Sequence, residues 1–268
     1  MDRRRLWRYV RRTWITLGLG FTVVFTAWSL VAYRAAPEGH RAMRSDAAVD
    51  VRRDDGIMSF VPTARDTGTR PRLVFFPGAL VDPIAYAPLA RAAAAAGFHA
   101  YIVELPRRGA MGGADDPAVD ERLDRALAMG RTSRQWIVAG HSRGAVVASR
   151  IASERRHALA GLVLIGTTHP RDVDLGAWRH PVTKLVGTRD GLATVEEVEA
   201  NRSRLPPSTR WVWIDGGNHS QFGWYGFQPG DRRATVPAAE QRDVMTREVL
   251  AMLARVESAA IAARGARR

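Results

Sequence analysis

The chain has 268 residues, a formal net charge of +13 and no cysteine. Its length accommodates one sizeable α/β domain and is short for two. The lack of cysteine excludes disulfide frameworks, zinc sites built on cysteine and a thiol nucleophile.

The positive charge raises the question of a nucleic-acid partner. Of the 40 basic residues only Lys184 is a lysine, a skew typical of codon choice in a G+C-rich genome rather than of a phosphate-binding surface. Residues 1–44 contain nine of the arginines, and the remaining charge is spread without a dense run. We therefore expect no nucleic-acid partner. The sequence also lacks a metal-ligand cluster and a phosphate-binding glycine pattern, so we expect neither a metal nor a cofactor.

The N-terminal segment has the pattern of a membrane anchor. Residues 1–13 form a basic tail, and the twenty residues 14–33 carry no charge. As a helix they would span a hydrocarbon core of roughly 30 Å. Six arginines precede the apolar run, which places the N-terminus in the cytoplasm and the rest of the chain outside it. The alternative is a cleaved signal peptide and a secreted protein, although the run is long for a signal and no clean cleavage site follows it.

Residues 34–56 are polar and are expected to be a linker to a domain over residues 57–268. Within the domain, short apolar runs alternate with helical segments, which predicts a mostly parallel, doubly wound sheet of about seven strands. In such sheets ligands bind at the carboxyl ends of the strands. The expected strands are 57–61, 72–76, 98–104, 136–140, 162–166, 182–186 and 211–214, and the expected helices are 83–96, 120–129, 143–155, 195–204 and 238–263.

The central motif is Gly140-His141-Ser142-Arg143-Gly144, between the apolar run 136–139 and a good helical segment. This context predicts a nucleophile elbow, in which glycines allow a tight turn and the serine is held in a strained conformation. The N–H of Arg143 is then one donor of an oxyanion hole. A chance match in a glycine-rich chain is the competing interpretation.

Three further strand ends carry candidate groups. After 72–76, the turn at Pro77-Gly78 leads to Ala79, the preferred second oxyanion donor, with Leu80 next. After 182–186 stands Asp190, which is either an orienting acid or an ordinary turn residue before glycine. After 211–214, His219 lies in a glycine-rich loop and is the candidate base.

Two other histidines compete with His219 for this role. His141 precedes the serine and is expected to pack beneath the turn. His169 follows the run 162–166 and is the stronger rival, but it precedes Asp190 in the chain. The order Ser142, Asp190, His219 is the one found in α/β-hydrolases.

On these residues the domain resembles the α/β-hydrolase fold, and within it the small serine hydrolases grouped near dienelactone hydrolase and related carboxylesterases. The resemblance extends to a bacterial subgroup with Pro-Gly-x-x-Val-Asp-Pro, here residues 77–83, and Asn-His-x-x-Phe-Gly-x-Tyr-Gly, here residues 218–226. It implies Ser142 as nucleophile, His219 as base and Asp190 as orienting acid. Pro77-Gly78 departs from the His-Gly common in esterases, which affects the details of the oxyanion hole.

The expected chemistry is hydrolysis of a small or exposed carboxylic ester through an acyl-enzyme. Only residues 167–181 are available for a cap between two strands, so an open site is expected. Leu80, Phe222 and Trp224 are candidate substrate contacts, although the aromatic residues could instead pack the loop onto the domain. An acyltransferase with the same triad and a non-catalytic, membrane-tethered binding module are the alternative functions. The sequence predicts no oligomeric state.

Overall fold

The computed structural model describes residues 3–64, 68–130, 135–155 and 158–266, except for the side chain of Leu30. Eight strands form one sheet in the order β1-β2-β4-β3-β5-β6-β7-β8. The pairs β1–β2 and β2–β4 are antiparallel, and the remaining neighbours are parallel. The strands are β1 (Val49–Asp54), β2 (Ile57–Pro62), β3 (Arg72–Phe76), β4 (Ala100–Val103), β5 (Trp136–His141), β6 (Leu159–Ile165), β7 (Val182–Gly187) and β8 (Arg210–Ile214).

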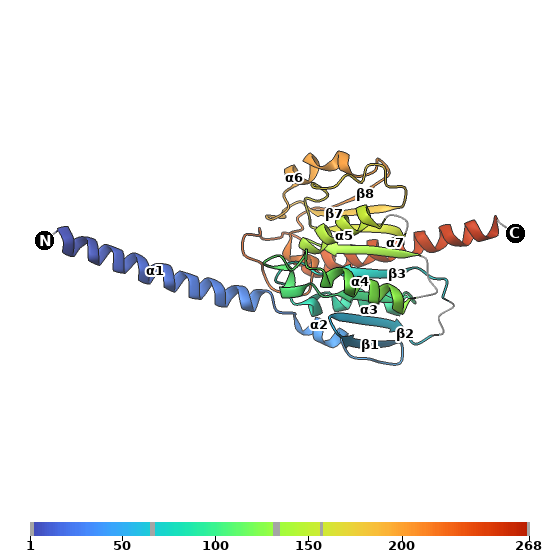
Figure 1. Cartoon of the computed structure of the whole chain (residues 1–268), viewed down its shortest axis with the longest axis horizontal. Coiled ribbons are helices and arrows are strands. Elements are labelled where there is room, and N and C mark those ends of the chain that lie inside the picture. The colour runs from blue at the N-terminus through green and yellow to red at the C-terminus, as the bar shows by residue number, and fades with distance from the viewer. Residues whose placement is uncertain (1–2, 65–67, 131–134, 156–157, 267–268) are drawn as a thin grey trace.

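Helices cover both faces of this sheet (Figure 1). The helices α3 and α7 contribute to one buried apolar cluster, and α4 and α5 contribute to the other. Every residue of β3, β5 and β7 is buried, as expected for parallel strands between two helical layers. The helices are α1 (Arg3–Ala32), α2 (Pro37–Ala42), α3 (Ala87–Ala95), α4 (Ala118–Met129), α5 (Arg143–Glu154), α6 (Val195–Ala200) and α7 (Ala238–Gly265).

The predicted linker over residues 34–56 needs correction. It contains α2 and β1, and β1 pairs with β2 along its whole length, so the sheet has eight strands rather than about seven. The sequence Val-Asp-Val-Arg-Arg-Asp has no sustained apolar face, and its last three residues are exposed. Such an edge strand is stabilised by its neighbour rather than by burial, which is why its apolar pattern is weak.

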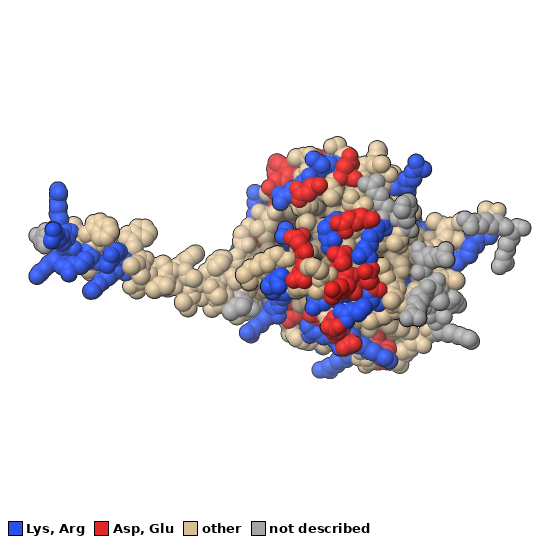
Figure 2. All heavy atoms as spheres, in the orientation of Figure 1, with Lys and Arg blue, Asp and Glu red and all other residues tan. Residues whose placement is uncertain are grey.

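The long helix α1 projects away from the domain, and arginines gather around its far end (Figure 1, Figure 2). Its apolar side chains are exposed along much of its length; Trp14 is 73% exposed and Phe21 is 71% exposed. Within the described residues, no helix satisfies the combined length and hydropathy expected of a membrane-crossing segment. The predicted transmembrane span over residues 14–33 is therefore not supported.

The last turn of α1 is held by two loops of the domain. The carbonyl oxygen of Ala32 accepts a hydrogen bond from the N–H of Gly226 at 2.8 Å, and that of Tyr33 accepts one from Asp82 at 2.9 Å. Because Asp82 follows β3 and Gly226 follows β8, α1 joins the domain at the edge where the parallel strands have their carboxyl ends.

Candidate active site

The turn between β5 and α5 has the geometry of a nucleophile elbow. Ser142 has φ +52° and ψ −120°, a strained conformation for a residue with a side chain. A Cβ atom on Gly140 would lie 2.2 Å from the carbonyl oxygen of Gly144, and one on Gly144 would lie 1.9 Å from that of Phe76. The elbow therefore requires both glycines, and it brings the serine beside the end of β3.

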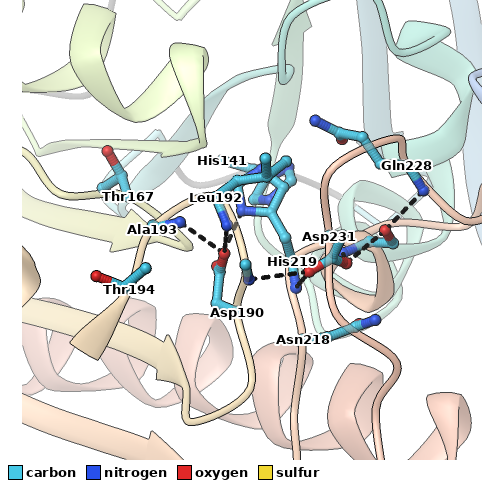
Figure 3. A network of polar contacts seen from close by, with 12 residues as sticks. His141, Thr167, Asp190, Leu192, Ala193, Thr194, Asn218, His219, Gln228 and Asp231 are labelled. Atoms are coloured by element: carbon cyan, nitrogen blue, oxygen red, sulfur yellow. Dashed lines mark hydrogen bonds and ion pairs between the residues drawn. The ribbon is translucent and has the colours of Figure 1, made fainter. Parts of the chain in front are cut away.

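The candidate acid and base form a buried hydrogen-bonded pair. The His219 Nδ1 atom donates to Oδ2 of Asp190 at 2.9 Å, and both residues are at most 2% exposed. The other oxygen of Asp190 accepts the N–H groups of Leu192 at 2.8 Å and Ala193 at 2.7 Å (Figure 3). A carboxylate with these partners can only accept, so the proton of neutral His219 is on Nδ1 and its Nε2 is free to act as a base.

The free nitrogen of His219 lies in the neighbourhood of the elbow. His219 Nε2 is buried and has no hydrogen-bond partner among the described residues. The ring of His141, the residue directly before Ser142, lies 4.5 Å from the ring of His219 between centroids. No hydrogen bond joins Ser142 to His219 in the described part of the chain, but such bonds often tighten only when substrate binds. The arrangement thus brings the predicted nucleophile, base and acid to one place.

Asp231 holds the loop that carries the base. Its carboxylate accepts the N–H of His219 at 3.3 Å and the N–H of Ser220 at 2.8 Å, and it also accepts the Ser220 hydroxyl at 2.6 Å. A further bond from the N–H of Gly191, at 3.1 Å, ties this loop to the one that carries Asp190 (Figure 3). The sequence analysis missed Asp231, because an aspartate after glycine in a loop looks like any turn residue.

A second residue that the sequence analysis missed is Tyr86. Its hydroxyl accepts the N–H of Gly78 at 3.2 Å and lies 2.7 Å from Nδ1 of His141. The amide donates to the hydroxyl, and the direction of the hydrogen bond between the hydroxyl and His141 follows the imidazole tautomer. Burial is the main cause that holds the pKa of His141 well below its usual value, and the nearby His219 lowers this pKa further. His141 is therefore neutral. As expected, His141 packs beneath the turn. Tyr86 links it to the candidate oxyanion loop, residues 77–80 after β3.

The N–H groups of the oxyanion loop differ in their availability. Gly78 donates to Tyr86, and Leu80 donates to the carbonyl of Arg108 at 2.8 Å. The N–H of Ala79 has no acceptor among the residues that the structure describes. This favours Ala79 over Leu80 as the second donor.

Ala79 also lies close to Arg143, the other predicted donor. The position that a Cβ atom on Gly109 would take is 3.7 Å from Cα of Ala79 and 3.7 Å from Cγ of Arg143. Arg143 is the first residue of α5, where main-chain N–H groups have no partner within the helix. Both predicted donor residues therefore lie beside Gly109, next to the elbow.

The candidate substrate contacts divide into one exposed residue and two packed ones. Leu80 is 44% exposed. Phe222 is fully buried and packs against His141 with ring centroids 5.8 Å apart, which favours a packing role over substrate contact. Trp224 packs against the core, and the guanidinium of Arg242 lies 5.3 Å from its ring. The aromatic residues after the base therefore attach the loop to the domain, which was the alternative interpretation.

His169 does not take the role of base. It lies after β6 with Nε2 3.8 Å from a carboxylate oxygen of Asp172, and among the described residues no hydrogen bond connects it to Asp190. Burial lowers its pKa to about 4. Its carbonyl oxygen accepts a hydrogen bond from the buried amine of Lys184. The stretch from residue 167 to 181 that contains it forms neither helix nor strand, in keeping with the expected absence of a helical cap.

Comparison with known proteins identifies the family and the fold. The sequence model described as the alpha/beta hydrolase family matches residues 72–243. Curated protein sequences contain no match. Among solved structures, Est1E from Butyrivibrio proteoclasticus is 12% identical with a TM-score of 0.54, and the match covers 78% of this chain and 100% of Est1E.

Two other solved structures match at similar levels. One is described as a membrane phospholipase A and bacterial virulence factor; it is 15% identical with a TM-score of 0.54, over 95% of this chain and 99% of that one. The other is a putative dienelactone hydrolase from Klebsiella pneumoniae, 16% identical with a TM-score of 0.52, over 74% and 92% of the two chains. At these identities the likeness is one of fold, and the predicted α/β-hydrolase fold is confirmed.

Proposed function

Because the chain belongs to the alpha/beta hydrolase family, we propose that it is a serine hydrolase that cleaves carboxylic esters through an acyl-enzyme. The observation that carries this proposal is the buried pair of His219 and Asp190 beside the strained Ser142. A histidine whose tautomer is fixed by a carboxylate, next to a serine at a tight strand-to-helix turn, is the arrangement needed to activate a hydroxyl nucleophile.

In the proposed reaction, His219 Nε2 takes the proton of Ser142 as Oγ attacks the ester carbonyl. The N–H groups of Ala79 and Arg143 stabilise the oxyanion, and Asp190 stabilises the imidazolium. His219 then protonates the leaving alcohol and the acyl-enzyme forms. In the second half, His219 activates a water molecule that releases the acid and restores Ser142.

Ser142→Ala tests this function directly. The variant should reduce p-nitrophenyl butyrate hydrolysis by at least about a thousandfold and abolish labelling by a fluorophosphonate. Ser149→Ala is a matched control, because Ser149 is a buried serine of α5 whose hydroxyl donates only to the carbonyl of Ala145. A wild-type protein that neither cleaves esters nor takes the label would refute the hydrolase proposal, and an acyl product that appears only with an added alcohol would favour an acyltransferase.

We also propose that α1 attaches the enzyme to a membrane, with the catalytic domain outside the cytoplasm. The exposed apolar side chains of α1 and the arginines at its far end support this proposal. The connection of α1 to the carboxyl edge of the sheet would then direct the site toward the bilayer. The membrane phospholipase A with the same fold makes lipid esters a reasonable first class of substrate to test.

Membrane fractionation of cells that express the full chain tests the attachment. The protein should remain in the membrane pellet after a high-salt wash, and a reporter fused to the C-terminus should be active only on the extracytoplasmic side. Recovery of the intact chain in the soluble fraction would refute attachment by α1, and a shortened chain in the medium would indicate a cleaved signal.

A further inference from the structure

A groove runs between α1 and the candidate oxyanion loop, outside the group of residues proposed to do the chemistry. Its volume is about 530 Å³, within the range of small-molecule sites. The groove begins at the loop that follows β3 and continues along the last turns of α1. It is lined by Phe25, Thr26, Ser29, Tyr33, Leu80 and Arg108.

The wall formed by α1 is fixed in place. The carbonyls of Ala32 and Tyr33 accept hydrogen bonds from Gly226 and Asp82, and Tyr33 itself is only 9% exposed. Residue 35 forms an isolated bridge with Tyr225. The final turn of the helix is therefore bound to both loops that flank the site, and the groove is a built feature of the fold.

The opposite wall is formed by a leucine in an unusual conformation. Leu80 has φ +65°, in the left-handed region that costs free energy for a residue with a branched side chain. Its N–H donates to the carbonyl of Arg108 at 2.8 Å, and the Arg108 guanidinium donates to its carbonyl at 3.4 Å. These two bonds hold the Leu80 side chain outward, 44% exposed, directly after the free N–H of Ala79.

The chemistry of the lining selects for hydrocarbon. Phe25 and Leu80 contribute hydrocarbon side chains, Thr26, Ser29 and Tyr33 add neutral hydroxyl groups, and none of the described lining residues is a carboxylate. The single charged group among these described residues is the guanidinium of Arg108, on an exposed side chain 4.0 Å from the carboxylate of Asp82. A groove without negative charge among its described lining residues, whose wall at Leu80 directly follows Ala79, is suited to an unbranched acyl chain whose carbonyl lies at Ala79.

We propose that this groove binds the acyl chain of the substrate, and that the enzyme acts on esters of unbranched fatty acids of medium to long chain. The inference rests on the proposed ester hydrolysis. The carbonyl oxygen lies at the N–H of Ala79, the first methylenes contact Leu80, and the chain continues along Thr26 and Ser29. Each methylene buried there raises kcat/KM by up to about fourfold until the groove is filled.

A panel of p-nitrophenyl esters with acyl chains of two, four, eight and twelve carbons tests the proposal. The full-length protein is reconstituted in phospholipid nanodiscs, because free detergent would compete for the groove. Wild-type kcat/KM should rise from the acetate to the octanoate or laurate. A maximum at the acetate with a steady fall for longer chains would overturn the proposal.

Ser29→Trp fills the groove from α1 and should lower kcat/KM for the laurate at least about tenfold, while the acetate changes less than about twofold. Val31→Trp is the matched control, since Val31 is 63% exposed on the same helix and does not line the groove. Thr26→Trp replaces Ser29→Trp if that protein does not fold. Equal chain-length profiles for a folded groove variant and the control would contradict the proposal.

Laurate binding to the Ser142→Ala protein, measured by calorimetry, separates the groove from the reaction. Binding that Ser29→Trp weakens at least about tenfold supports the groove even if no ester is cleaved, in which case the hydrolysis proposal alone fails. Ester hydrolysis by the wild type without laurate binding leaves the function intact and refutes the groove.

Discussion

The proposed nucleophile and the proposed base are positioned in different ways. Ser142 is placed by its own turn, because Gly140 and Gly144 permit a conformation that any side chain at those positions would block. His219 is placed by residues distant in sequence. Gln241 of α7 accepts the N–H of Asn218 at 3.0 Å and donates to its carbonyl at 2.7 Å, and Asp231 accepts the N–H of His219. Steric fit therefore defines one half of the site, and long-range hydrogen bonds define the other.

This difference predicts that the elbow tolerates change least. In Gly144→Ala the new Cβ atom would lie 1.9 Å from the carbonyl oxygen of Phe76 and 2.6 Å from that of Pro77, both backbone atoms that cannot move aside. We expect a loss of at least about 3 kcal/mol in the free energy of unfolding, or no folded protein, and no measurable activity. Gly265→Ala is the control, because nothing lies within 4 Å of its added atom. Urea unfolding that gives similar stabilities for both variants would contradict the steric account.

A substitution that loosens the loop carrying His219 should reduce catalysis more than it reduces the stability of the protein. Asp231→Ala removes the acceptor of four main-chain N–H groups, those of Gly191, His219, Ser220 and Arg232, and His219 should then sample positions away from Ser142. We expect kcat to fall about ten- to a hundredfold with a smaller change in KM. Asp215→Ala is the matched control from the same loop, since among the described residues its carboxylate accepts a hydrogen bond from the Thr188 hydroxyl alone, at 3.1 Å. Steady-state rates that are the same for the two variants would mean that other contacts hold the loop.

Tyr86→Phe tests the connection between the two halves. Without the hydroxyl, the N–H of Gly78 and Nδ1 of His141 both lose a buried partner. We expect kcat to fall roughly tenfold and the free energy of unfolding to fall by about 1–3 kcal/mol. Tyr225→Phe is the control, because Tyr225 is also buried but its hydroxyl bonds to Gln228 at 3.2 Å. If both variants lose stability equally and neither loses kcat, Tyr86 is a packing residue only.

The smallest expected effect concerns Lys184, which is buried in β7, the strand that precedes the loop with Asp190. Burial lowers its pKa to about 7 from an ordinary 10.5. Between these values the unfolded chain binds more protons than the folded one, so wild-type stability should rise with pH across this window. Lys184→Met should be more stable than the wild type by roughly 1–3 kcal/mol at pH 6, and the difference should shrink as pH approaches 10. Urea titrations at several pH values that give a constant difference would refute this.

The alternation of short apolar runs with helical segments was sufficient to predict most of the fold. The strands β3 to β7 are largely buried on both faces, so their sequences are mostly apolar and can be recognised without a structure, although β7 also contains Thr183 and Lys184. β1 was missed because an exposed edge strand needs no such run. The candidate set Ser142, Asp190 and His219 could be predicted because each residue lies in the segment after a strand, and strand ends converge in a parallel sheet.

The roles of the residues around the candidate site could not be predicted in the same way, because they depend on contacts between distant parts of the chain. Phe222 follows the base by three positions and was predicted to contact substrate, but the chain turns it inward against His141. Tyr86 and Asp231 have no local pattern, since their partners lie in other elements. The sequence could indicate the candidate reacting groups, whereas the residues that orient them are defined by contacts that only the folded chain creates.

The attachment of α1 to the domain has a practical consequence for purification. A version of the protein that starts at residue 34 would retain all eight strands and would be easier to handle without the exposed apolar helix. However, the carbonyls that bind Asp82 and Gly226 belong to Ala32 and Tyr33. Rates measured on such a shortened protein would describe an enzyme with two loosened loops at its entrance, and screening for substrates or inhibitors should therefore begin with the intact N-terminus.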